Sequence, residues 1–231
     1  MYTHGSGRRT ITWLNKVVLA HSGRQLTGLR SIWDDKTGRA FNEKEWSGAL
    51  AYLNKVLRNA CFRYIQFNIL HRVYLAPQVL NKIFPGLDAS CPRCCYPTAS
   101  FWHMLWECQE IIPFWREVLI ILANISGRPQ LDGIVVCLLG MFPRPKKFCT
   151  VWRFFDLAIL LAKRAITMRW KSHTSPEASQ WKLEVIRWAT RESNALKLEE
   201  RRSVRKRQVS HIWDELLNKI TKYGEVVTDS N

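Results

Sequence analysis

A short segment rich in cysteine constrains what this chain can fold into more than any other feature of the sequence. Cys91, Cys94, His103 and Cys108 follow the pattern C-x2-C-x8-H-x4-C, and Cys95 in place of Cys94 gives C-x3-C-x7-H-x4-C. Zn²⁺ prefers four tetrahedral ligands drawn from thiolates and imidazoles, and a C-x2-C turn places two sulfurs on one ion. The spacing therefore predicts a Zn²⁺ site with Cys91, Cys94, His103 and Cys108 as ligands, and with Cys95 as the alternative to Cys94.

The four predicted ligands would complete the coordination of the ion, so we expect a structural Zn²⁺ and not a catalytic one. The alternative is a chance grouping of reduced core cysteines with a surface histidine. Because five residues of an ideal α-helix turn by about 140° relative to one another, His103 and Cys108 would not share a face of a straight helix. The helix that carries His103 is therefore predicted to end or distort before Cys108. We expect the cysteines in apolar surroundings, Cys61, Cys137 and Cys149, to belong to the core.

Apolar residues at helical spacing recur along most of the chain. They make the fold class mainly α: a helical domain with a small Cys/His zinc-knuckle-like unit and a long C-terminal helix. A capping box of Asn42 and Glu45 predicts the start of a helix that continues to about Leu70. Further helices are predicted after Pro77, from Pro113 to about residue 127, over 151–171 and, as one long helix that includes the charge run 197–207, from Pro176 onward.

Helix-breaking residues and stretches without helical periodicity of apolar residues divide the sequence into three parts. Residues 1–41 contain scattered glycines and little periodicity, so we expect a loosely ordered lead-in. Residues 42–126 are predicted to form a helical segment that contains the zinc-binding unit at about 86–113. Residues 127–231 are predicted to form a helical C-terminal region, which opens with a stretch rich in proline and glycine.

The chain carries 35 Lys and Arg against 19 Asp and Glu, a formal net charge of +16. Such an excess predicts a polyanionic partner, because neutralising phosphates releases their counterions. We expect RNA, or single-stranded DNA, as this partner, ahead of an anionic membrane surface. Each apolar stretch falls short of the roughly 20 residues that span a bilayer, so no membrane span is predicted. Seven cysteines and a polar start without a secretory signal predict an intracellular location, in a cytoplasmic ribonucleoprotein, in the nucleus or in both.

RNA recognition commonly combines phosphate contacts with stacking of bases on aromatic rings or guanidinium planes. Basic and aromatic residues mix in two places, one before and within the cysteine segment and one between residues 144 and 171. For each residue the alternative is core packing of the ring or a solvated helix face for the charge. The predicted nucleic-acid contacts are Arg63, His71, Arg72, Tyr74, Arg93, Lys146, Lys147, Arg164, Arg169 and Lys171.

Several groups of residues give the chain a resemblance to a known family: Leu70–Pro77, Ile83–Pro85, the cysteine segment with Trp106–Cys108, and Pro113–Trp115. They resemble the carboxy-terminal cysteine-rich region of vertebrate LINE retrotransposon second-reading-frame proteins, the zinc-binding segment that follows the reverse transcriptase. The spacing through Cys95 is similar to the mammalian form of the motif, and the spacing through Cys94 to the form common in other lineages. The likeness extends over about residues 29–218, through Trp33, Trp46, Ala162–Arg164, Trp170–Lys171, Trp181 and Ile212–Trp213.

The resemblance implies a non-catalytic RNA-binding accessory domain with structural zinc, which assists ribonucleoprotein assembly. The whole family protein is an endonuclease and an RNA-directed DNA polymerase, but we expect no enzyme activity of this chain. Polymerase chemistry needs an aromatic-x-Asp-Asp turn and a third carboxylate to hold two metal ions. The Asp34-Asp35 pair has no aromatic residue two positions before Asp34, and we interpret it as a solvated turn.

Two other functions stay open at this point. One is a zinc-stabilised helical protein-interaction module whose final helix, from Pro176 onward, packs on a protein partner. The other is a transposon remnant without selected function. A zinc deaminase is disfavoured, because Ser90 precedes Cys91 where the deaminase motif has a proline, and no His-x-Glu motif precedes it.

Overall fold

The computed structural model describes residues 28–55, 60–126, 133–141, 150–200 and 207–223. By its internal contacts the chain divides into two units, residues 1–50 and 51–231.

In the first unit a helical segment over residues 28–37 precedes the start of α2, Glu43–Lys55, a helix that continues into the second unit. The predicted capping box starts α2: Asn42 N–H donates to Glu45 Oε2 at 3.1 Å, and Glu45 N–H donates to Asn42 Oδ1 at 2.9 Å. The ring of Phe41 packs on Trp46, with ring centroids 6.3 Å apart. This pair is the hydrophobic staple that often accompanies a capping box, so the start of α2 is fixed by local sequence.

Two expectations for this region differ from the structure. Residues 28–37 of the predicted lead-in are helical, and Asp34-Asp35 lies in this helix and not in a turn. The Asp34 carboxylate accepts a hydrogen bond from Phe41 N–H at 2.9 Å and lies 3.7 Å from Arg30. These two contacts pair the Asp34 carboxylate and hold the chain that follows the helix. The periodicity of apolar residues does not reveal this role of Asp34. The remaining lead-in, residues 1–27, lies outside the described residues.

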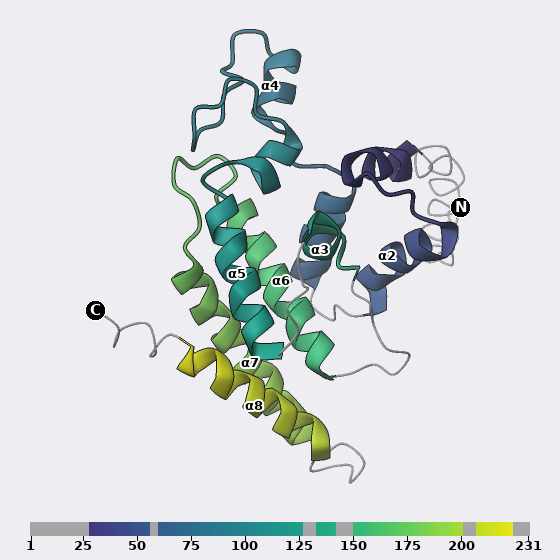
Figure 1. Ribbon diagram of the computed structural model, residues 1–231, viewed down its shortest axis with the longest axis vertical. Coiled ribbons are helices and arrows are strands. Elements are labelled where there is room, and N and C mark those ends of the chain that lie inside the picture. Colours follow the sequence, from purple (N-terminus) through teal and green to yellow (C-terminus); the bar gives the residue numbers. More distant parts are fainter. Residues whose placement is uncertain (1–27, 56–59, 127–132, 142–149, 201–206, 224–231) are drawn as a thin grey trace, which may run out of the picture. The chain divides into compact units, whose positions relative to one another are not determined.

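The second unit is built from helices alone among its described residues (Figure 1). The predicted fold class, mainly α with a small Cys/His unit, is confirmed. The predicted helices after Pro77, from Pro113 and over 151–171 appear within a few residues of their expected bounds. The elements are α3 Ala60–Leu70, α4 Pro77–Ile83, η1 His103–Glu107, α5 Ile112–Ser126, η2 Val135–Leu139, α6 Thr150–Met168, α7 Ala178–Glu200 and α8 Arg207–Lys222, where η1 and η2 are π-helical turns.

The central element of the second unit is α6, which contacts α3, α5, α7 and α8. The apolar stripe predicted for it is buried, with no member more than 8% exposed: Trp152, Phe155, Ile159, Ala162, Ile166 and Trp170. Phe154 and Leu160, which lie off that stripe, are fully buried as well. Because its neighbours cover several sides, α6 is buried almost all round, as expected of a core helix.

The apolar sides of α7 and α8 pack against each other in antiparallel order. Lys182 Nζ donates to the Thr221 carbonyl at 3.2 Å, and Ser193 Oγ donates to Asp214 Oδ1 at 2.8 Å. The expected long helix is present as the 23 residues of α7, but α8 runs back along it instead of extending it. The physical reason is burial: Trp213 and its apolar neighbours on α8 would remain in water on a single extended helix.

The helix predicted from residue 42 to Leu70 is present as two described helices, α2 and α3. Their buried faces are out of phase. Trp46 is buried in α2, and continuing its stripe at 3.6 residues per turn leads to Tyr64, which is 65% exposed. In α3 the buried residues are instead Phe62 and Ile65. Ile65 lies one residue after Tyr64, and one residue rotates the face of a helix by about 100°. One straight helix would therefore not bury both Trp46 and the buried residues of α3 on the same face.

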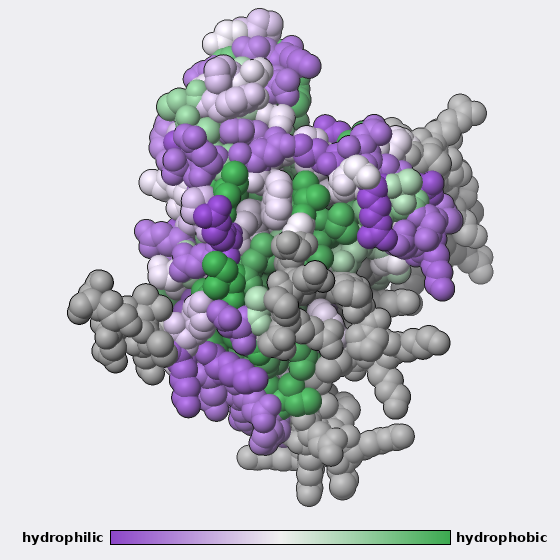
Figure 2. Space-filling model, viewed as in Figure 1, coloured by the Kyte–Doolittle hydropathy of each residue, from purple (hydrophilic) through white to green (hydrophobic). Residues whose placement is uncertain are grey.

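Among the described residues, no helix combines the length and the apolar character that crossing a bilayer requires. The surface around α4 mixes hydrophobic and hydrophilic side chains (Figure 2). Ile83, Phe84 and Leu87 are each about half exposed there, at 53%, 58% and 49%, and α4 itself contains no buried residue. The segment between α3 and η1 therefore has little apolar core of its own.

Candidate metal centre

The predicted ligands come from two short segments that precede α5. Cys91 and Cys94 lie on a turn after α4, His103 begins η1, and Cys108 directly follows η1. Cys108 N–H donates to the His103 carbonyl at 2.9 Å, which is the i to i+5 bond of a π-turn. A π-turn contains more residues than an α-turn, so residues five apart approach the same face. The distortion predicted before Cys108 is confirmed, and Cys108 itself is extended at φ −61° and ψ 128°.

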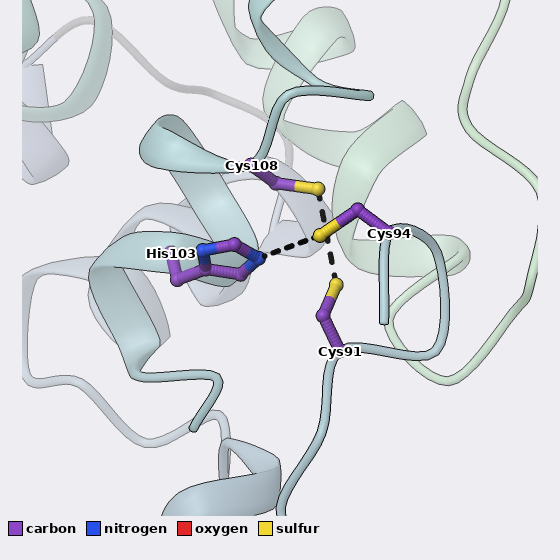
Figure 3. Close-up of side chains that lie close together, drawn as sticks. All are labelled: Cys91, Cys94, His103 and Cys108. Atoms are coloured by element: carbon purple, nitrogen blue, oxygen red, sulfur yellow. Dashed lines mark hydrogen bonds between the residues drawn. The ribbon is translucent and has the colours of Figure 1, made fainter. Parts of the chain in front are cut away.

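The side chains of Cys91, Cys94, His103 and Cys108 converge on one point (Figure 3). Their four ligand atoms all lie within 4.8 Å of one another. The Sγ atoms of Cys91 and Cys108 are 3.8 Å apart, and Cys94 Sγ lies 3.2 Å from His103 Nε2. A tetrahedral Zn²⁺ with Zn–S bonds of about 2.3 Å separates two sulfurs by about 3.8 Å. The donor types and their separations therefore fit a metal ion of this kind.

Backbone amides point at the sulfurs of the cluster. The N–H groups of Arg93 and Cys94 donate to Cys91 Sγ, and Glu110 N–H donates to Cys108 Sγ. The turn itself is closed by Cys91 N–H, which donates to the Tyr96 carbonyl at 2.8 Å. Amide hydrogen bonds favour the charged form of a thiol, which is the form that ligates a metal.

The two candidate second ligands occupy different environments. Cys94 is half-buried and belongs to the cluster, whereas Cys95 is exposed and is not one of its four members. Cys95 adopts a left-handed backbone conformation with φ 58°, and its N–H donates to the Cys91 carbonyl at 2.9 Å. The turn thus ends at Cys95, and the structure favours Cys94 as the ligand.

Burial and hydrogen bonds shift the pKa values of the donors. Burial raises the pKa of the Cys108 thiol to about 12 and lowers the pKa of His103, so that imidazole is neutral and free to ligate. Burial also raises the pKa of Cys91, but the hydrogen bonds from the backbone of Cys94 and Arg93 outweigh it, and the net pKa lies below the ordinary value. A metal ion entering this site must displace thiol protons, most of all from Cys108.

Arg93, a predicted nucleic-acid contact, points into the protein. It is 9% exposed, and its Nη2 donates to the Met104 carbonyl of η1 at 2.9 Å. Its Nε and Nη1 are buried without a hydrogen-bond partner. The prediction of a phosphate contact is therefore corrected. Since Zn²⁺ with three thiolates carries a net charge of −1, a buried guanidinium beside the cluster offsets the charge of the loaded site.

Two of the predicted basic and aromatic clusters meet at the end of α6. The guanidinium carbon of Arg72 lies 5.6 Å from the ring centroid of Trp102, just before η1. The ring of Tyr74 lies 5.2 Å from that of Trp170, whose Nε1 donates to the Leu75 carbonyl at 2.8 Å. Residues about 100 positions apart in the sequence thus share one aromatic cluster beside the metal centre.

The other predicted nucleic-acid contacts differ in exposure. Arg63 and Lys171 are exposed, and His71, Arg164 and Arg169 are half-buried, with Arg169 Nη2 donating to Gln180 Oε1 at 2.7 Å. Two further predicted contacts, Lys146 and Lys147, lie outside the described residues, as does Cys149.

Sequence reasoning missed or misplaced several other residues. Cys137 is buried as expected, but Cys61 is exposed. Phe67 and Trp102 were not among the expected contacts, although Phe67 lies three residues after Tyr64 and four before His71, a helical spacing that the sequence shows.

The four donors can hold a metal ion, and they equal in number the four ligands that tetrahedral Zn²⁺ prefers. A scan against models of known protein families finds none that matches this chain.

Proposed function

We propose that this chain is a non-catalytic RNA-binding accessory domain with a structural Zn²⁺, derived from the C-terminal end of a LINE-type retrotransposon reverse transcriptase protein. The observation that carries the proposal is the convergence of Cys91, Cys94, His103 and Cys108 from separate segments. Four protein ligands favour a structural ion over a catalytic one. The proposal implies an intracellular location, in ribonucleoprotein particles or the nucleus.

Zn²⁺ held by these residues would join the turn after α4 to the end of η1. Structural zinc sites contribute on the order of 10 kcal/mol to the folding of segments that lack their own core. The segment between α3 and η1 is of this kind, because α4 buries no residue. Loss of the ion should therefore loosen α4 and the cysteine turn while the helices packed on α6 remain.

The RNA-binding part of the proposal is supported by charge and by the position of the cations. The net charge of +16 favours a polyanion. Arg63 and Lys171 are exposed, and Arg72 lies on an aromatic ring next to the metal centre. Proteins commonly bind single-stranded nucleic acids with cations placed beside aromatic rings.

The test is a titration of the zinc-loaded protein against a labelled single-stranded RNA at several salt concentrations. We expect the logarithm of the affinity to fall linearly with the logarithm of salt between ~50 and ~200 mM. Lys171→Ala should weaken binding and reduce the salt slope by about one. Lys219→Ala removes the same charge from the exposed face of α8 and should change both quantities less. A flat salt response, or equal effects of the two variants, would count against the proposed site.

The protein-interaction alternative loses its main support. It rests on a free apolar stripe in the last helix, but most of that stripe is buried within this chain. Trp181, Val185, Leu196, Leu216 and Ile220 are at most 8% exposed, and Trp188 and Ile212 are half-buried. A remnant without selected function would show no expression, which a transcript measurement tests.

A further inference from the structure

One face of α3 is buried and the opposite face carries exposed aromatic rings. Phe62, Ile65 and Ile69 are at most 8% exposed, and α3 contacts α6 and η2. In contrast, Tyr64 is 65% exposed and Phe67 is 46% exposed. The rings therefore do not contribute much to the core, and their position needs another explanation.

The exposed rings share one sector of the helix with Arg63 and with the half-buried ring of His71. At 100° per residue, Arg63, Tyr64, Phe67 and His71 fall within about 100° of its circumference. His71 N–H donates to the Phe67 carbonyl at 2.9 Å, so residue 71 continues the helical register beyond Leu70. The Phe67 and His71 rings are 4.2 Å apart at their centroids and tilted by 34°. These residues form a contiguous surface and not scattered single side chains.

The sequence that contains this face is basic. The sequence from Trp46 to Leu87 contains no Asp or Glu, although it contains several lysines and arginines. Arg63 lies within the aromatic sector and is exposed, and Arg72 follows its last member. The face therefore complements a ligand that is negatively charged and also has flat apolar surfaces.

We propose that Tyr64, Phe67 and His71 form a stacking platform for unpaired nucleic-acid bases, with Arg63 beside it to contact phosphate. This inference rests on the proposed RNA-binding function and names the surface that holds the bases. Single-stranded nucleic acid offers both the phosphates and the flat rings that the surface complements. A polyanion without bases would use the arginines but not the rings.

The test compares two oligomers of ~10 nucleotides, a length within the usual site size of single-strand binders. One is an oligouridylate, and the other has the same phosphates but abasic sugars. We expect the wild-type protein to bind the oligouridylate roughly tenfold or more tightly than the abasic oligomer. Phe67→Leu, which keeps the apolar bulk but removes the ring, should abolish most of this difference, and Phe67→Trp should preserve it.

Leu183→Ala is the control variant, since it removes an apolar side chain that is 55% exposed on α7. It should leave the preference for bases unchanged, and thermal melts of all variants should match the wild type. Equal binding of the two oligomers by the wild type, or an unchanged preference in Phe67→Leu, overturns the platform while RNA binding itself stands. Failure of the wild type to bind either oligomer overturns the proposed function as well.

Discussion

Arg72 has a backbone conformation that favours glycine. Its φ is 55°, its N–H donates to the Ile69 carbonyl at 3.1 Å, and Val73 N–H donates to the Asn68 carbonyl at 2.8 Å. These bonds form the Schellman motif that ends α3, in which the left-handed residue is usually glycine. A side chain at such a position costs on the order of 1 kcal/mol. The arginine is retained in spite of this cost, and its guanidinium lies over Trp102.

Glycine and alanine variants separate the backbone cost from the side-chain role. Arg72→Ala keeps the strained Cβ but loses the contact with Trp102, whereas Arg72→Gly loses both. We expect Arg72→Gly to be more stable than Arg72→Ala by about 1 kcal/mol in urea denaturation. Both variants should bind single-stranded RNA more weakly than the wild type, and their affinities should be equal to each other. If the glycine variant were the less stable of the two, the strain argument would be wrong.

The metal ligands illustrate what residue types alone predict. Donor chemistry and spacing are sufficient to name Cys91, His103 and Cys108, because few other roles require this set. The choice between Cys94 and Cys95 depends on the φ of a single residue in the turn, which periodicity does not encode. The inward direction of Arg93 depends likewise on a hydrogen bond to the Met104 carbonyl of η1, and the direction of that carbonyl is not encoded by periodicity.

At the scale of elements, a buried lysine joins three helices. Lys163 of α6 is fully buried, and its Nζ donates to Gln66 Oε1 of α3 at 2.5 Å and to the Leu138 carbonyl of η2 at 3.0 Å. Gln66 Nε2 donates to the same carbonyl at 2.9 Å. The π-turn η2 therefore has a carbonyl satisfied by two side chains, one from each neighbouring helix.

Stability should depend on pH through this lysine. Burial lowers the pKa of Lys163 to about 7 from 10.5, although Cys137 and Asp156 act in the opposite direction. Between these values the unfolded chain binds more protons than the folded one, so the free energy of unfolding rises with pH, by up to about 1.4 kcal/mol per pH unit. Below pH 7 both states are protonated and this dependence ends.

Lys163→Met isolates the contribution of this lysine from those of the other titrating groups. The difference in unfolding free energy between wild type and Lys163→Met, measured by urea denaturation at several pH values, should increase from pH 7 to pH 10.5. Curves that run parallel over this range would show that the amine does not change its protonation on folding.

The sequence predicts where helices occur better than it predicts whether one helix continues or two helices form. The starts of α2 and α4 follow from a capping box and from Pro77, and the stripe of α6 is fully buried as expected. The antiparallel order of α7 and α8 was not predictable, because an apolar stripe that resumes after a charge run fits one helix or two. Only the partner face that buries the stripe distinguishes them, and that is a tertiary property.

At the scale of the whole molecule, several of the predicted basic contacts and the candidate metal centre lie in the same unit. The Cys/His cluster lies in the segment between α3 and α5, and Arg72, Tyr74 and Lys171 lie along or beside that segment. Sequence composition predicts a polyanionic partner but gives no place for it. In the structure, Trp170 at the end of α6 joins two basic regions that are distant in sequence, and this is where we propose that the polyanion binds.

The metal content of two serine variants tests the central claim most directly. Wild type, Cys94→Ser and Cys95→Ser are purified in parallel, dialysed against metal-free buffer and analysed for zinc per chain by inductively coupled plasma mass spectrometry. The account predicts one zinc per chain in the wild type and in Cys95→Ser, and loss of most of the zinc in Cys94→Ser. Equal zinc in all three proteins, or a wild type without zinc, would contradict it.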